Sequence, residues 1–225
     1  MTKSAAPGPR QPRKARARAS LTRDAIVEAA LKLVDDEGLG GLTTRKLAQR
    51  LGVEAMSIYH WFPSKQHLLD ALVEHAIASI PLERPGLDPE AQLRRLAYDY
   101  RAMAARFPRL YALVALHRLN TPRGVAFIER VLELMRALVP SDEVAARQFR
   151  VMGYFLTGAA LEETSGYARG PSAAAPVDDA YIAAHCPRLA AAAPYFKQPH
   201  WDATFALGLE ALIAGFRAAD PRKPR

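Results

Sequence analysis

The sequence is poor in cysteine and lacks long apolar runs, and each shortage excludes a class of protein. Its 225 residues include one cysteine, Cys186, so no disulfide can form within the chain, which fits a reducing compartment such as the cytoplasm. No segment approaches the roughly 18 apolar residues that a membrane helix needs. The basic N-terminus is not followed by an apolar stretch, so no secretory signal peptide is expected. These observations predict a cytoplasmic protein with no membrane partner.

Signals for β-strands are missing too, and the apolar residues recur at helical spacing instead. Thr22 can cap the first helix, and Gly38 can end it in the left-handed conformation. The spacing predicts helices over residues 21–38, 44–51, 54–61, 64–80, 89–106, 109–117, 122–138, 141–164, 178–186 and 202–218. The expected fold class is all-α, with a small N-terminal head and a larger helical body on either side of the linker "PLERPGLDPE".

Positive charge is concentrated at the N-terminal end. Residues 1–23 carry seven basic residues and no acidic one, whereas residues 66–219 carry sixteen of each sign. Residues 43–65 add four basic residues against one acidic residue. This distribution predicts a polyanion partner for the N-terminal end alone. Residues 1–20 are rich in Pro, Ala and Arg, so we expect a disordered basic arm. Such an arm can either contact DNA or serve only to keep the chain in solution.

Residues 43–62 have the spacing of a helix-turn-helix. Ala48 offers a small side chain where two helices cross, Gly52 tolerates the turn between them, and Ile58 anchors the second helix. The remaining core positions of this unit are Leu47, Leu51, Val53 and Phe62. The second helix of such a motif can lie in the major groove of DNA.

The polar and exposed positions of this motif form the predicted DNA-binding set. If Ile58 and Phe62 point inward, the opposite face of the second helix points outward. Threonine and lysine near helix N-termini suit phosphate oxygens, and the fork of Arg45 suits a guanine edge. The predicted contacts are Thr43, Thr44, Arg45, Ala55, Met56, Tyr59, His60 and Lys65. The alternative is an ordinary helical hairpin with a solvated polar face.

The segments "GLTTRKLAQRLGVE" and "IYHWFPSKQHLLDAL" resemble the DNA-binding head of the tetracycline repressor (TetR) family. More weakly, "GYFLTGAALEE" and "FALGLEALIAGF" resemble the family's dimer-forming helices. The resemblance implies nine or ten helices, a homodimer, an effector pocket in the body, and repression that a small molecule releases. Ala55 and Met56 replace the Gln-Pro of the family's founding member, and His60-Trp61 inverts its Trp-His order. We therefore expect a different operator.

Two sets of residues in the body carry the remaining predictions. Small residues on apolar helices favour close helix approach, so the predicted dimer interface comprises Gly153, Gly158, Gly208, Leu212 and Gly215, with packing inside one chain as the alternative. The candidates for the effector pocket are Tyr98, Tyr100, Met103, His117, Asn120, Thr121, Phe127, Met152, Phe155 and Glu162. Such aromatic and methionine stripes also occur in ordinary cores. The resemblance places a pocket histidine where Pro81 stands, so a tetracycline–magnesium chelate is not the expected ligand.

The sequence as a whole predicts a ligand-responsive transcription regulator. We assign residues 21–80 to the DNA-binding domain and residues 81–225 to effector binding and dimerisation. The expected partners are a double-stranded DNA operator, a second copy of the chain, and a small apolar or aromatic effector. We expect no cofactor, metal or catalysis, because the body has no Gly-rich phosphate loop, nucleophile–base pair or metal cluster. An enzyme with a helix-turn-helix appendage and an architectural DNA-binding protein remain alternatives, and an activator remains possible beside a repressor.

Overall fold

The structure is a computed structural model that describes residues 21–165 and 173–218, so the predicted basic arm lies outside the described residues. The α-helices are α1 (Arg23–Gly41), α2 (Thr44–Leu51), α3 (Ala55–Trp61), α4 (Lys65–Ala78), α5 (Pro89–Arg106), α6 (Pro108–Leu116), α7 (Pro122–Leu138), α8 (Asp142–Ser165), α9 (Asp179–His185), α10 (Pro187–Ala192) and α11 (Trp201–Ala218). Two short 3-10 helices, η1 (Ala193–Phe196) and η2 (Gln198–His200), precede α11. None of the helices in the described ranges is long and apolar enough to span a membrane.

The all-α prediction is confirmed, although eleven α-helices in these residues exceed the nine or ten expected. The extra helix is α10, which begins at Pro187. Proline ends the preceding helix because it cannot continue it, but the first position of a new helix accepts it. Gly38 takes a φ of +75°, as predicted, yet helical turns resume beyond it as far as Gly41. The left-handed conformation of Gly38 was therefore predicted correctly, but this residue forms a kink within α1 and not the end of the helix.

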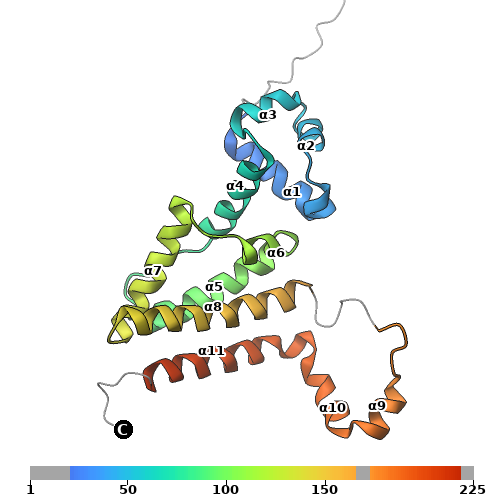
Figure 1. Cartoon of the computed structure of the whole chain (residues 1–225), viewed down its shortest axis with the longest axis vertical. Coiled ribbons are helices and arrows are strands. Elements are labelled where there is room, and N and C mark those ends of the chain that lie inside the picture. The colour runs from blue at the N-terminus through green and yellow to red at the C-terminus, as the bar shows by residue number, and fades with distance from the viewer. Residues whose placement is uncertain (1–20, 166–172, 219–225) are drawn as a thin grey trace, which may run out of the picture.

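Helices α1 to α4 form a small head at one end of the molecule (Figure 1). Leu47, Ile58 and Phe62 are buried there, as the helix-turn-helix spacing predicted. Gly52 has a φ of +67° at the end of α2, a conformation that glycine adopts without steric cost. The predicted core residues Leu51 and Val53 are only half-buried, at the edge of the same core.

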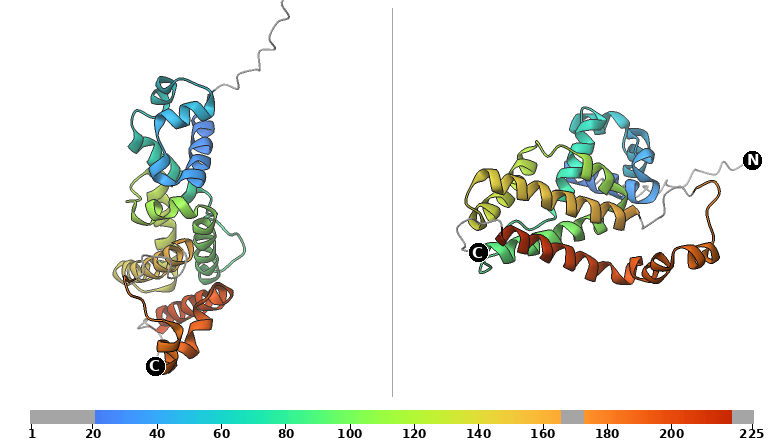
Figure 2. Two further views of the ribbon diagram at one scale, coloured as in Figure 1. Left: turned by 90° about the vertical axis from the view of Figure 1, so that its right-hand side faces the viewer. Right: turned by 60° about the horizontal axis from the view of Figure 1, so that its bottom comes forward.

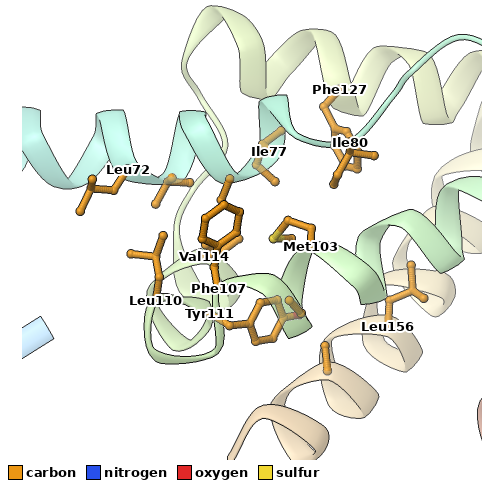
Figure 3. Close-up of a cluster of buried hydrophobic side chains, with 14 of the residues drawn as sticks. Leu72, Ile77, Ile80, Met103, Phe107, Leu110, Tyr111, Val114, Phe127 and Leu156 are labelled. Carbon is orange, nitrogen blue, oxygen red and sulfur yellow. The ribbon is translucent and has the colours of Figure 1, made fainter. Parts of the chain in front are cut away.

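A hydrophobic cluster joins the head to the body. Figure 3 shows Ile77 on α4 close to Val114 on α6 and Met103 on α5, with Phe127 of α7 nearby. All four side chains are buried. Because α4 also contributes Leu72 to the same buried core, one helix carries apolar contacts into both parts of the molecule. The apolar core is therefore continuous from the head through α4 into the body.

In the body, α5 and α7 pack on α8, and α11 runs alongside α8 (Figures 1 and 2). Helices α9 and α10 project away from this bundle and bury none of their residues. Apolar side chains are exposed on α9, on α10 and just before α9, which together we call the α9–α10 arm; they include Val177, Tyr181 and Leu189. The α9–α10 arm therefore contributes little to the hydrophobic core of its own chain.

Charged side chains hold α11 against α5. Glu90 accepts a hydrogen bond from Arg217 Nε at 2.6 Å and pairs with Arg94 at 2.7 Å, while Arg94 also donates to Glu210 at 2.7 Å. The hydrogen bond from Arg217 is the largest cause that holds the pKa of Glu90 below its ordinary value. A lowered carboxyl pKa adds stability above the ordinary glutamate range, and this contribution is lost as the pH falls through the lowered pKa.

We expect Glu90→Gln to lower the free energy of unfolding at neutral pH by about 1–2 kcal/mol, because two charge-assisted contacts weaken. Much less of this difference should remain at about pH 3, where carboxylates become protonated. Thermal denaturation at both pH values measures the effect. Glu83→Gln is the control, since Glu83 is exposed and forms no ion pair among the described residues. Equal losses in the two variants would contradict this role for Glu90.

Candidate functional site

The turn between α2 and α3 presents the start of α3 at the outer end of the head (Figure 1). Thr43 caps α2, and its Oγ1 accepts the backbone N–H of Lys46 at 3.3 Å. Ser64 caps α4 in the same way, through the backbone N–H of His67 at 3.4 Å. Both helix N-termini therefore begin in an ordered cap, and their first N–H groups remain suited to an anion.

The outer surface of the motif is rich in exposed side chains. Met56 is 72% exposed and Tyr59 43% exposed, and Arg45, His60 and Lys65 are exposed as well. Ala55 departs from the prediction, because it is half-buried and packs against the head core. Thr44 is also half-buried, and its Oγ1 donates to the Tyr59 hydroxyl at 3.5 Å. Trp61, at the end of α3, is 40% exposed and adds an aromatic side chain that the predicted set omitted.

The basic residues of α2 differ in whether their charge is already paired. Arg50 contacts Asp36 at 2.6 Å, and Lys46 contacts Glu37, so acidic residues at the end of α1 neutralise both. Arg45 forms no ion pair with any residue that the structure describes. This pairing could have been anticipated from the sequence, because the acidic residues 35–37 lie shortly before the basic residues of α2. Arg45 is therefore the α2 cation that is free to meet a polyanion.

A cavity of about 400 Å³ lies in the body between α5, α6, α7 and α8. Of the predicted pocket residues, Tyr100, His117, Phe127 and Met152 line it. The predictions omitted Leu96, Leu119, Phe149, Arg150, Gly153 and Thr157, which also border it. Phe149, Met152 and Gly153 recur at helical spacing on α8, so the face could have been found from the sequence once Met152 was included.

The cavity is mostly apolar but has a few polar groups. The Tyr100 hydroxyl lies 3.0 Å from the hydroxyl of Tyr111, which is fully buried. Burial raises the pKa of Tyr111, so this phenol stays neutral near pH 7. His117 Nε2 lies 2.9 Å from Asp70 Oδ1 on α4, and Gln66 Nε2 donates to the same oxygen at 2.7 Å. Partial burial opposes the effect, but hydrogen bonds from His117 and Gln66 lower the pKa of Asp70.

The other predicted pocket residues do not border this cavity. Met103 is 2% exposed and belongs to the core, Asn120 is exposed, and Thr121 caps α7 by accepting the Gly124 N–H at 3.2 Å. Phe155 and Glu162 border a separate cavity of about 390 Å³ between α8 and α11. Tyr98 borders a third, more polar cavity of about 640 Å³ that also includes Arg101 and Asp202. Residue type alone does not reveal which face of a helix meets which neighbour.

The residues predicted for a dimer interface take different positions. A side-chain carbon added at Gly208 would lie 2.5 Å from the Phe155 ring, so Gly208 packs against α8 of its own chain. Gly153 borders the 400 Å³ cavity, and Leu212 is half-buried. Gly158 and Gly215 are exposed with open space beside them. The described part of the chain contains no group of three or more histidine, cysteine, aspartate or glutamate side chains that could hold a metal ion.

The head and the body each match a known family of domains. Residues 26–72 match the family described as "Bacterial regulatory proteins, tetR family". Residues 84–219 match the family described as "Tetracyclin repressor-like, C-terminal domain". The chain belongs to the TetR family. It is therefore a ligand-responsive, DNA-binding transcription regulator, as the sequence predicted.

Individual TetR-family relatives support the assignment over most of the chain. The class A tetracycline repressor of transposon 1721 from Escherichia coli is 31% identical, over 87% of this chain and 90% of the relative. The repressor DrrR1 of Streptomyces coeruleorubidus is 30% identical over 64% of this chain, and the match spans 54% of DrrR1. The structure of the TetR family protein ActR from Streptomyces coelicolor in complex with actinorhodin has a TM-score of 0.74 at 28% identity, covering 91% of this chain and 99% of ActR.

Proposed function

We propose that the protein is a homodimeric repressor whose two α3 helices read a palindromic operator. In this proposal the dimer places the helices about 34 Å apart, which is one turn of duplex DNA. Met56, Tyr59 and His60 face base edges, and Arg45 pairs with a guanine. The exposure of these side chains and the unpaired charge of Arg45 support the assignment. Ala55 borders the same groove but contributes less, since it is half-buried.

Three further residues position the head on the DNA backbone. Thr43 and Thr44 stand at the start of α2, and Lys65 stands at the start of α4. The Thr43 hydroxyl uses an oxygen lone pair for its cap, so its hydrogen remains free to donate to a phosphate oxygen. These contacts fix the orientation of α3 but carry no base information.

The effector occupies the 400 Å³ cavity between α5 and α8. Its largely apolar wall and its few polar groups suit an apolar or aromatic molecule, with Tyr100 and His117 as contacts. The likeness to ActR, whose structure contains actinorhodin, favours an aromatic ligand. Met103, Asn120 and Thr121 are not part of this proposed site. Phe155 and Glu162 line the separate cavity between α8 and α11. They would contact the effector only if dimer formation placed that cavity of the second subunit beside the 400 Å³ cavity.

Release from DNA follows from a shift between two states of the dimer. The effector changes operator affinity only to the extent that it prefers one state over the other. The buried cluster of Ile77 with Met103 and Val114 supports a route from the cavity wall to α4 and the head. On this proposal, residues 21–80 form the DNA-binding domain and residues 81–225 form the sensor and dimerisation domain. The protein acts in the cytoplasm and catalyses no reaction.

The dimer forms through the outer faces of α8 and α11. Leu207 on α11 is 73% exposed, and Tyr154 and Val151 on α8 are 64% and 42% exposed. Gly158 and Gly215 add open surface on the same two helices, which suits close approach of a second helix pair. Exposed apolar side chains concentrated on paired helices are typical of an interface with another chain.

Leu207→Glu tests this surface. We expect the variant to dissociate at micromolar concentrations and to bind the operator more than about tenfold more weakly, because one head loses the effective concentration that its linked partner provides. Sedimentation equilibrium and operator titration measure the two effects. Leu116→Glu is the matched control, since Leu116 is 86% exposed on α6. A Leu207→Glu protein that remains dimeric would refute the interface.

The observation that carries the proposed function is that α4, the last helix of the head with its exposed helix-turn-helix, packs against α6 and α7, which line the body cavity. The decisive experiment is a screen of aromatic compounds for a loss of operator affinity at fixed salt, with the dimeric state checked in parallel. The proposal predicts that at least one compound lowers affinity while the dimer stays intact. It fails if operator binding responds to no small molecule.

A further inference from the structure

The cavity of about 390 Å³ lies where α11 begins beside the C-terminal half of α8 (Figure 1), and most of its lining is aromatic. Phe155 and Phe205 form one wall, with their ring centroids 5.3 Å apart. Tyr195, Phe196 and Trp201 complete the aromatic lining. No lining residue is shared with the 400 Å³ cavity that we assign to the effector. The volume is in the range of small-molecule sites, so a ligand of moderate size fits.

Local contacts hold the rings of this cavity in position. Trp201 Nε1 donates to the carbonyl oxygen of Phe196 at 3.0 Å, which fixes the indole against η1. The Tyr195 ring meets the His200 ring edge to face, with centroids 5.2 Å apart. Both η1 and η2 have proline in their first turn, where the ring restricts φ. The aromatic walls are therefore organised before a ligand arrives, which reduces the entropy that binding costs.

The charged residues that line the 390 Å³ cavity, Glu162 and Glu163, are both acidic. Glu163 accepts a hydrogen bond from Arg101 Nε at 2.7 Å, and Arg101 also pairs with Asp202 at 2.8 Å. Glu162 is exposed and forms no ion pair with any residue that the structure describes. One positive charge thus stands against three negative charges in this cluster, which leaves an excess of two negative charges.

The same surroundings already hold one cation of the chain itself. The guanidinium carbon of Arg101 lies 4.7 Å from the centroid of the Phe205 ring, while its Nε pairs with Glu163. An aromatic face attracts a cation within about 6 Å because the face of the ring is electron-rich. A carboxylate nearby adds direct attraction of opposite charges. The remaining aromatic faces and Glu162 offer a second cation the same combination of ring and carboxylate.

We propose that the 390 Å³ cavity binds a lipophilic organic cation, specifically a quaternary ammonium ion, with its charge between the aromatic rings and Glu162. A quaternary ammonium ion donates no hydrogen bond, so walls made of rings satisfy it as well as polar walls do. The excess negative charge repels an anion, and a neutral molecule gains burial without the electrostatic attraction. This site goes beyond the proposed function, because it is separate from the effector cavity and its occupancy does not require an effector there.

Two probes of nearly the same shape test whether the cavity selects positive charge. Benzyltrimethylammonium is a cation, whereas 2,2-dimethyl-3-phenylpropan-1-ol is neutral and has a quaternary carbon in place of the nitrogen. Trp61 and Trp201 are the two tryptophans of the chain, so Trp61→Phe leaves Trp201 as a fluorescent reporter within the cavity. In the full-length dimer with this change, we expect a saturable change in Trp201 fluorescence and a preference for the cation of at least about tenfold.

Two variants of exposed residues test the two parts of the site separately. Glu162→Gln keeps the shape of the side chain but removes its charge, so the preference for the cation should fall at least about fivefold. Tyr195→Leu keeps apolar bulk but removes a ring that is 64% exposed, so the cation should bind at least about threefold more weakly and the alcohol nearly as before. Glu129→Gln is the matched control, since Glu129 is exposed on α7 and does not line this cavity.

Equal affinities of the dimer for the two probes would overturn the proposal. So would a cation that fails to bind, which is the result expected if a basic side chain of the second copy fills the cavity. A preference for the cation that survives in both Glu162→Gln and Tyr195→Leu would show that it binds elsewhere. None of these results would contradict ligand-responsive repression, which is tested by the effect of small molecules on operator affinity.

Discussion

Arg45→Ala and Tyr59→Ala should each weaken specific operator binding by about 1–3 kcal/mol while leaving the fold and the dimer intact. Arg45 is exposed with no ion pair among the residues described, so its removal breaks no contact that holds the head together. Tyr59 is 43% exposed, and its hydroxyl accepts a long hydrogen bond of 3.5 Å from Thr44. Titration of a fluorescent operator duplex against each variant, at one salt concentration, measures the loss.

Lys32→Ala is the matched control for Arg45→Ala, because it removes one exposed positive charge from α1 instead of α2. A general electrostatic effect would lower affinity for operator and unrelated DNA alike in both variants. Base recognition by Arg45 instead predicts that the ratio of operator affinity to unrelated-DNA affinity falls only in Arg45→Ala. Unchanged operator affinity in both Arg45→Ala and Tyr59→Ala would discard the proposed groove surface.

Leu47→Ala should destabilise the head by about 2–5 kcal/mol, which is the usual cost of emptying a fully buried leucine site. Leu47 is 0% exposed in the core that α2 shares with α1 and α3. The head is small, so it has few other contacts with which to offset the loss. We therefore expect DNA binding to be lost at temperatures at which the body remains folded, dimeric and able to bind ligand.

Hydrogen exchange followed by mass spectrometry can locate this effect. Peptides from α1 to α3 should lose protection in Leu47→Ala, whereas peptides from α5, α7 and α8 should keep it. Leu116→Ala serves as the control, because the side chain removed is 86% exposed, lies outside the proposed dimer interface, and leaves no internal cavity when it is lost. If the whole chain lost protection together, the head and the body would unfold as one unit, and this prediction would be wrong.

The helix-turn-helix could be predicted from the sequence because its determinants are local. Ala48, Gly52 and Ile58 lie within eleven residues, and each has one physical requirement to meet in the motif. The structure buries Ala48 and Ile58 and gives Gly52 a positive φ. Most helix ends were equally clear, since proline and capping residues act on their immediate neighbours.

The cavity was less accessible to sequence reasoning because it depends on how distant helices meet. Phe155 and Phe149 are both aromatic residues on α8, yet Phe149 borders the 400 Å³ cavity and Phe155 packs against Gly208 of α11. Helical spacing places them on different faces but does not identify the neighbour of either face. The pairing of His117 with Asp70, 47 residues apart, is a contact of the same long-range kind.

Sequencing of the genomic DNA fragments that the purified protein retains tests the central claim most directly. The salt concentration must be fixed at a moderate value, because binding to phosphates alone is strongly salt-dependent. The account predicts enrichment of a short palindrome upstream of one or a few genes, and loss of that enrichment in Arg45→Ala. Uniform, salt-sensitive retention of all fragments, with no palindrome, would contradict a dimeric regulator that reads a specific operator.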